Sequence, residues 1–207
     1  MNCDPIAYWY RLFEYMIFGS ALQRRRLEFL NEVADARRVL ILGDGDGRFT
    51  AEFVNRNSSA LVDSIDLSRK MLALAKRHAA GATNVRFRLG DARTIDLTGP
   101  FDLVVTHFFL DCFTEADLEP LVARISAQCT PGARWIVSDF SLPPSGFGRS
   151  AAKALIRFMY FFFRVLTGLT VIRLPNYTAV LELHGFRLEE RRTVWDRFLV
   201  SELWAAS

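Results

Sequence analysis

Three glycines and two aspartates alternate directly after the first apolar run of the chain. That run spans residues 39–42 and has the length of a buried strand. The bend 43–47 reads Gly-Asp-Gly-Asp-Gly, and Phe49 and Phe53 then recur at helical spacing. Glycines in such a bend let a ligand approach the backbone closely. Because carboxylates repel a pyrophosphate and attract ammonium and sulfonium groups, the bend favours a cationic ligand.

A further carboxylate stands at the end of the second apolar run. The run 61–66 ends in Asp66, where an acid accepts hydrogen bonds from both hydroxyls of a ribose. A dinucleotide is a second candidate, but its fingerprint needs a third glycine at the position of Arg48. S-adenosylmethionine carries both cationic groups and no phosphate, so it fits these residues better. A structural turn without a ligand is the remaining alternative.

The elements that must position these residues alternate between strands and helices. Ser68 is a good N-cap for the helix that follows Asp66. The almost continuous apolar run 101–106 is typical of a central parallel strand that is covered on both faces. Further strands are expected at 84–89 and 134–140, and helices at 114–128, 151–169 and 175–183.

In this order the motifs resemble those of the class I S-adenosylmethionine-dependent methyltransferases. The resemblance runs from about residue 38 to residue 140. The first motif of that family is a strand followed by Gly-x-Gly-x-Gly. The stretch 66–72, Asp-Leu-Ser-Arg-Lys-Met-Leu, matches the family's acid-x-Ser pattern and its Met-Leu pair. The family usually has an acid two residues before the first glycine, where this chain has Ile41, and we expect Asp44 to take over part of that charge role.

Residues and resemblance together predict a single α/β domain with a Rossmann-like, seven-stranded and mostly parallel sheet. Helices cover both faces, and the C-terminal strand is antiparallel. Residues 37–207 form the methyltransferase domain, and residues 1–36 form an N-terminal helical cover of two helices hinged near Phe18 and Gly19. The segments 187–195 and 198–204 match the terminal hairpin of the family.

The resemblance implies that S-adenosylmethionine is the cofactor and S-adenosylhomocysteine the product. In the family an acid at the place of Asp91 binds the adenine amino group, and the backbone amide at Ala92 meets the ring. A turn aspartate that caps its own backbone is the alternative for Asp91. No metal site is expected. The residues expected to bind the cofactor are Gly43, Asp44, Gly45, Gly47, Asp66, Leu67, Met71, Asp91, Ala92 and Thr106.

The stretch 107–113, His-Phe-Phe-Leu-Asp-Cys-Phe, follows the central strand at the end where such sheets bind ligands. His107 has an ordinary pKa that suits a general base at neutral pH. Asp111 is a candidate to orient the acceptor or to act as the base, and Tyr160 to offer it a hydroxyl. The alternatives are that His107 bonds only to backbone and that Asp111 caps the next helix. Holding the acceptor in line without any proton-transfer residue is a further alternative.

The helix expected at 151–169 combines aromatic residues with a stripe of cations. Its apolar length approaches a membrane span, but Arg157 and Arg164 interrupt it. Three interpretations stay open: a core helix packed on the sheet, a wall of an apolar acceptor pocket, or an interfacial helix that contacts a membrane. The residues expected to bind the acceptor, by resemblance for the N-terminal ones, are Tyr8, Phe18, Phe108 and Phe161.

Length and composition limit the classes of protein that this chain resembles. Its 207 residues suit one domain with a sizeable core. A net charge of only +3 argues against nucleic acid as the main partner, and the run 24–26 of three arginines is typical of a solvated face. Three scattered cysteines indicate a reducing compartment, and the start of the sequence lacks the basic region of a signal peptide. We therefore expect a cytoplasmic protein with a small-molecule acceptor.

These observations predict a methyltransferase that moves the methyl group of S-adenosylmethionine to a small, apolar or aromatic acceptor, at oxygen, nitrogen or carbon. A nicotinamide-dependent oxidoreductase is the alternative enzyme, and the acidic bend and Arg48 count against it. A non-catalytic nucleoside-binding module is the alternative without chemistry, and Ile41 gives it some support.

Overall fold

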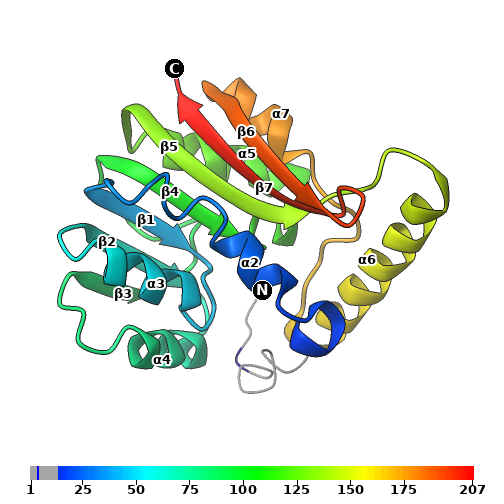
Figure 1. Ribbon diagram of the computed structural model, residues 1–207, viewed down its shortest axis with the longest axis horizontal. Coiled ribbons are helices and arrows are strands. Elements are labelled where there is room, and N and C mark those ends of the chain that lie inside the picture. Colours follow the sequence, from blue (N-terminus) through cyan, green and yellow to red (C-terminus); the bar gives the residue numbers. More distant parts are fainter. Residues whose placement is uncertain (1–3, 5–13) are drawn as a thin grey trace.

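The structure is a computed structural model that describes residue 4 and residues 14–207. Its strands are β1 (Arg38–Leu42), β2 (Leu61–Asp66), β3 (Val85–Leu89), β4 (Phe101–His107), β5 (Cys129–Phe140), β6 (Phe186–Val194) and β7 (Leu199–Ala206). They form one sheet in the order β3-β2-β1-β4-β5-β7-β6 (Figure 1). The expectation of a seven-stranded α/β sheet is confirmed.

Five neighbouring strands of this sheet, β1 to β5, run parallel. Strand β7 is antiparallel to β5 and to β6, which confirms the antiparallel C-terminal strand. The chain passes from β1 to β2 and β3 on one side, whereas β4 and β5 lie on the other side of β1. Open α/β sheets bind ligands outside the carboxyl ends of their strands at such a reversal, and the bend 43–47 lies there.

The helices are α2 (Ala21–Arg26), α3 (Arg48–Arg56), α4 (Arg69–His78), α5 (Glu115–Ser126), α6 (Gly146–Thr167) and α7 (Tyr177–Leu183), with a 3₁₀ helix η1 (Leu110–Cys112). Alternate residues of β1 point to opposite faces of the sheet. Leu40 and Leu42 pack in one core with α5 and α7, and Val39 and Ile41 pack in another core with α3. Both faces are therefore covered, as the continuous apolar runs predict.

After residue 14, the N-terminal cover is less helical than its periodicity predicts. Gly19 has φ +57° and ends a helical turn, at the place of the expected hinge, whereas most of the first helix expected before it lies outside the described residues. Helix α2 ends at Arg26, and residues 27–35 are turns with hydrogen bonds between residues three apart. These turns bury Phe29 and Val33 against the sheet beside α3, so their spacing reflects burial rather than one long helix.

Helix α2 is fixed to the sheet by two buried serines. Ser138 Oγ of β5 and Ser201 Oγ of β7 both donate to the carbonyl oxygen of Arg25, at 3.0 and 2.9 Å. The two serines face each other because β5 and β7 pair at that register. Their bonds fix the C-terminal end of α2, which carries the next residue, Arg26, toward the carboxyl ends of the parallel strands.

Helix α6 stands off the sheet, at the end toward which β5 runs (Figure 1). Its inner residues Ile156, Met159 and Tyr160 pack with Phe18 of the N-terminal cover and with Phe140 at the end of β5. The interpretation of this helix as a core helix packed on the sheet holds only in part, because its inner side joins a core at the end of the sheet while its outer side is exposed. It forms a wall at the same edge of the sheet as the glycine bend.

Candidate functional site

A cavity of about 270 Å³ lies at the carboxyl ends of the parallel strands. The segments that follow β1, β2, β3 and β4 line it, as the reversal of strand order predicts. Eight of the ten residues expected at the cofactor line this cavity: Gly43, Asp44, Gly45, Asp66, Leu67, Met71, Asp91 and Ala92.

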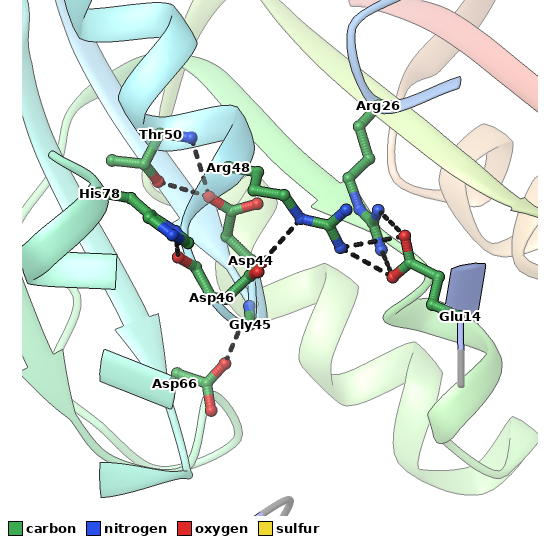
Figure 2. Close-up of polar contacts among 9 residues, drawn as sticks. All are labelled: Glu14, Arg26, Asp44, Gly45, Asp46, Arg48, Thr50, Asp66 and His78. Atoms are coloured by element: carbon green, nitrogen blue, oxygen red, sulfur yellow. Dashed lines mark hydrogen bonds and ion pairs between the residues drawn. The ribbon is translucent and has the colours of Figure 1, made fainter. Parts of the chain in front are cut away.

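Asp44 is a buried carboxylate with one oxygen left for a ligand. Its Oδ2 accepts hydrogen bonds from the Thr50 amide and hydroxyl, at 2.8 and 2.7 Å, and so satisfies the start of α3 (Figure 2). Its Oδ1 is buried and has no hydrogen-bond partner among the described residues. Burial raises the pKa of this carboxyl. A cation that reaches Oδ1 would restore the ionised form, so Asp44 suits an ammonium group.

Asp66 is placed to bind a ribose. Its Oδ1 accepts from the Ser68 amide at 2.7 Å. Its Oδ2 accepts from the Gly45 amide at 3.3 Å (Figure 2). These bonds orient the carboxylate at the rim of the cavity. Burial raises the pKa of Asp66 to about 6, which is close enough to neutrality for pH to control its charge.

The opposite part of the cavity is lined mainly by Leu67, Met71, Ala92 and Asp91. The apolar side chains provide surfaces for a flat ring. The Asp91 carboxylate pairs with Arg93 at 2.6 Å, and this bond lowers the pKa of Asp91. Asp91 also accepts from the Arg93 amide at 2.9 Å, as a turn aspartate does. The turn interpretation of Asp91 is confirmed by this contact, whereas its binding of the adenine amino group stays a prediction, which its place in the cavity lining allows.

An ion-pair network closes the cavity on the side of the N-terminal cover. Glu14 accepts two hydrogen bonds from Arg26, at 2.8 and 2.9 Å, and two from Arg48, at 3.0 and 2.8 Å (Figure 2). Arg48 also pairs with Asp46 of the bend at 2.9 Å. Burial alone would raise the pKa of Glu14, but the two guanidinium groups hold this pKa below its ordinary value. The residue in place of the third glycine thus ties the cover to the bend.

Arg26 is the functional residue that sequence reasoning missed. The run 24–26 was expected to be a solvated face, but Arg25 and Arg26 are buried, and Arg26 lines the cavity. Its guanidinium lies 5.1 Å from the centre of the Phe108 ring. The burial of Arg26 depends on its ion pair with Glu14, a tertiary contact between residues twelve apart that no local sequence pattern shows.

Two residues expected at the cofactor serve the fold instead. A Cβ at Gly47 would lie 2.5 Å from Ala75 Cβ and 2.6 Å from Ala75 Cα, so this glycine allows α4 to approach the bend. Thr106 is buried in β4, where its hydroxyl accepts from Trp135 Nε1 at 2.9 Å. Neither residue is among those that line the cavity.

His107 lines the cavity but is poorly placed to exchange protons. Its side chain is buried edge-on against Phe49, with ring centres 4.8 Å apart, and neither ring nitrogen has a hydrogen-bond partner among the described residues. Burial, and then the charge of Arg26, lower its pKa well below the ordinary value, so the imidazole is neutral.

A second, apolar cavity of about 70 Å³ adjoins the first. Phe108, Cys112 and Leu169 line both, so they form the wall between the two spaces. Phe108 has φ +51°, a conformation that costs a bulky residue about 1–3 kcal/mol and is often found at functional sites. The other side chains of the second cavity come mainly from α6 and the N-terminal cover: Ile17, Phe18, Leu22, Phe158, Met159, Tyr160, Phe162 and Phe163.

The residues expected to bind the acceptor divide into three groups. Phe18 and Phe108 line the apolar cavity. Phe161 is 66 % exposed and points away from it, whereas its neighbours Phe158 and Phe162 line it. Phe161 therefore lies outside the lining of this cavity, because the sequence does not show which side of α6 faces the cavity. Tyr8 lies outside the described residues.

Asp111, the carboxylate among the three catalytic candidates, lines the apolar cavity. Its amide donates to Asp139 Oδ2 at 3.2 Å, and Cys112 Sγ donates to Asp111 Oδ1 at 3.5 Å. Burial raises the pKa of Asp111 to about 6. Burial and the neighbouring Asp111 raise the pKa of Asp139 well above its ordinary value. Asp111 lies in η1, and Thr114 caps the next helix in its place.

Tyr160 lines the apolar cavity, but its hydroxyl has a structural partner. The hydroxyl donates to the Asp111 carbonyl oxygen at 3.1 Å. This bond fixes η1 against α6 and leaves only the lone pairs of the oxygen for an acceptor.

Comparison with known proteins agrees with this geometry. The profile of a family described as a methyltransferase domain matches residues 39–132, from β1 to the start of β5. Residues 39–132 therefore carry a methyltransferase domain. The family expectation drawn from the glycine bend and Asp66 is thereby confirmed.

Relatives of this methyltransferase domain differ in their named acceptors. The demethylmenaquinone methyltransferase of Thermus thermophilus is 34 % identical over 132 residues, which are 62 % of this chain and 59 % of that protein. The trans-aconitate 2-methyltransferase of Delftia acidovorans is 35 % identical over 123 residues, which are 57 % of this chain and 44 % of that protein. The matched region thus spans about half the length of these relatives.

Solved structures share the fold of the methyltransferase domain. The mitomycin 7-O-methyltransferase MmcR superposes with a TM-score of 0.71 at 16 % identity, covering 98 % of this chain and 60 % of that chain. The N-methyltransferase NodS of Bradyrhizobium japonicum, in complex with S-adenosylhomocysteine, gives a TM-score of 0.67 at 14 % identity, covering 90 % of this chain and 87 % of that chain.

Two glycine variants should separate the structural and ligand-binding roles of the bend. Gly45 and Gly47 both have positive φ, so alanine strains the backbone at either position. Only at Gly47 does the new Cβ collide with α4. Gly47→Ala should lower the free energy of unfolding by about 2–4 kcal/mol, and Gly45→Ala by about 1 kcal/mol, measured by urea denaturation. Equal losses for the two variants would contradict these roles.

The affinity of the methyltransferase domain for S-adenosylhomocysteine should fall in acid. If Asp66 binds the ribose as predicted, its ionised carboxylate accepts from the ribose hydroxyls, and its pKa is raised to about 6. The dissociation constant should therefore be flat above that pH and rise up to about tenfold per pH unit below it, measured by isothermal titration. Asp66→Asn is the control and should bind weakly and lose most of this dependence. A flat wild-type profile between neutrality and acid would contradict the role of Asp66.

Proposed function

We propose that this protein transfers the methyl group of S-adenosylmethionine to an apolar small molecule and releases S-adenosylhomocysteine. The observation that carries the proposal is the shared wall of Phe108, Cys112 and Leu169 between a polar cavity with nucleoside-binding features and an apolar cavity. The two cavities adjoin at these three side chains, so a cofactor in one and an acceptor in the other would meet there for direct transfer.

The residues of the first cavity fit S-adenosylmethionine. The unpartnered Oδ1 of Asp44 suits its ammonium, the carboxylate of Asp66 suits its ribose, and Ala92 and Met71 suit its base. A Cβ at Gly45 would have only Met71 Sδ nearby, at 3.9 Å, so the bend is open there. When bound, the cofactor supplies a methyl group that its sulfonium already activates. The protein then needs to position the acceptor beside this methyl group, to exclude water and to accept a proton from the acceptor.

Arg26 is proposed to bind the carboxylate of the cofactor. It is the cation that lines the cavity beside the Asp44 end, and α2 holds it there through Ser138 and Ser201. A guanidinium binds a carboxylate with two parallel hydrogen bonds, which is the geometry that Glu14 already adopts with Arg26. Glu14 and the ligand carboxylate are therefore expected to compete for Arg26, while Arg48 retains Glu14.

The acceptor is proposed to be apolar because of what lines the second cavity. Aromatic and aliphatic side chains form most of its wall, and the two carboxylates at it, Glu14 and Asp111, would repel an anion. Relatives are named for demethylmenaquinone, trans-aconitate and malonyl-[acyl-carrier protein] as acceptors. Of these, an apolar acceptor such as demethylmenaquinone suits this cavity better than the polycarboxylate trans-aconitate.

Asp111 is proposed as the residue that accepts a proton from the acceptor. As the acceptor's oxygen or nitrogen takes the methyl group, its bond to hydrogen breaks and the proton passes to the Asp111 carboxylate. The electron pair of the broken carbon–sulfur bond stays on sulfur. The Asp139 carboxyl, which accepts from the Asp111 amide, holds η1 in position. His107 lines only the first cavity and is not assigned this role.

Cofactor binding should discriminate between the two enzyme classes. S-adenosylhomocysteine should bind and NADH should not, because Asp44 and Asp46 repel a pyrophosphate. Arg26→Gln should raise the dissociation constant of S-adenosylhomocysteine about 10–100-fold through loss of a charge-assisted bond. Glu14→Gln removes the competing charge at nearly constant size, so it should bind as tightly as wild type or tighter.

Isothermal titration of both compounds, with thermal melting as the test of folding, measures these effects. Tight NADH binding would contradict the proposed function. Equal weakening by both variants, with unchanged melting, would contradict the role of Arg26.

Methyl transfer should depend on Asp111 when the enzyme is supplied with radiolabelled S-adenosylmethionine and a panel of apolar phenols, quinols and amines. Asp111→Asn should lower kcat about 10²–10⁴-fold while leaving the affinity for S-adenosylhomocysteine unchanged. In wild type, kcat should rise with pH through the pKa of Asp111 near 6 and then level off, because the base must be ionised.

Tyr160→Phe is the matched control for this experiment. It should lower kcat little, because the Tyr160 hydroxyl donates only to the Asp111 carbonyl oxygen in this structure. A large loss in the Tyr160 variant and none in the Asp111 variant would contradict the assignment. Tight binding of S-adenosylhomocysteine without transfer to any acceptor would favour a non-catalytic module.

A further inference from the structure

The outer face of helix α6 carries apolar and cationic residues side by side. Successive residues of an α-helix are 100° apart, so six exposed residues between positions 153 and 165 of α6 fall within about 140° of one another around the helix axis. The side chains that pack inward occupy the opposite side. We define the α6 outer face by its exposed members Lys153, Arg157, Phe158, Phe161, Arg164 and Val165.

The apolar half of this face is unusually exposed. Phe158, Phe161 and Val165 are 60 %, 66 % and 67 % exposed. Three large apolar side chains on consecutive turns form a continuous patch, which in a soluble domain marks a surface for another molecule or a membrane.

The cationic half of the face lacks counter-charges. Between Asp139 and Glu182 the sequence contains no aspartate or glutamate, but it contains five lysines and arginines. Of these, Arg173 pairs with Glu115. Within residue 4 and residues 14–207, no ion pair is formed by Lys153, Arg157 or Arg164. A second copy of this face would be repelled by it, whereas an anionic surface would be attracted.

The apolar cavity opens at the same place. Phe158 belongs to the α6 outer face and also lines that cavity. Ile17 of the N-terminal cover lines the cavity too, and its side chain is 44 % exposed. A molecule that leaves an apolar phase at the outer face would therefore meet the cavity without crossing a polar surface. No helix in the described part of the chain is long and apolar enough to cross a membrane.

We propose that the α6 outer face docks on an anionic lipid bilayer and that the acceptor enters the apolar cavity from that bilayer. Phe161 and Val165 insert at the headgroup level, and Lys153, Arg157 and Arg164 contact the anionic headgroups. The proposal rests on the proposed function and names the source of its acceptor. It gives Phe161 a function outside the cavity.

Co-sedimentation with lipid vesicles tests this docking. Wild type should sediment with phosphatidylcholine–phosphatidylglycerol vesicles, bind pure phosphatidylcholine vesicles much more weakly, and be released by salt. Arg157→Gln with Arg164→Gln should lower the partition coefficient about 25-fold, at about fivefold per charge. Phe161→Glu with Val165→Glu should abolish sedimentation. Neither pair lines the cavities.

Leu183→Glu is the matched control, because Leu183 is 70 % exposed on α7, away from α6 (Figure 1). It should sediment like wild type. Failure of wild type to bind anionic vesicles would overturn the proposal. So would self-association in solution that the Phe161 and Val165 changes abolish, because the face would then pair with a second copy. Titration of every variant with S-adenosylhomocysteine separates failure of the docking proposal from failure of the proposed function. Failure of the proposed function would show as a lack of S-adenosylhomocysteine binding in wild type.

Discussion

The site depends on a carboxylate that the fold buries without giving it a full set of partners. Asp44 lines the cavity and uses one oxygen to hold the start of α3, and its other oxygen has no hydrogen-bond partner within residue 4 and residues 14–207. A buried, half-satisfied carboxylate is costly, and a cationic ligand removes that cost. The bend that creates this situation needs positive φ at Gly43, Gly45 and Gly47. The same glycine-rich bend therefore determines both the local backbone geometry and the charge of the ligand that the site favours.

The side chains shared by the two cavities connect the glycine bend to the proposed place of methyl transfer. Phe108 follows β4 with a strained backbone, stacks under Arg26, and lines both spaces. Its amide donates to the Ser138 carbonyl, and the Ser138 hydroxyl donates to Arg25. The same serine therefore supports the wall and the helix that carries Arg26. Displacement of α2 would disturb both cavities together.

Local patterns predicted the elements that depend on neighbouring residues. The strands, the bend, the Ser68 cap and the hairpin were readable because period, glycine spacing and capping are local. Features that depend on distant contacts were not. Arg26 needs Glu14, Gly47 makes room for α4, and the choice between Phe158 and Phe161 depends on how α6 faces the sheet. Thr106 lies in the expected strand β4, but its hydroxyl accepts a hydrogen bond from Trp135.

The most direct test of this account is a crystal structure of the protein with S-adenosylhomocysteine. The account predicts its amino group at Asp44 Oδ1, its ribose hydroxyls at Asp66, and its carboxylate at Arg26 with Glu14 retained by Arg48. Density for the compound outside the glycine bend, with Asp44 Oδ1 still unpaired, would contradict it.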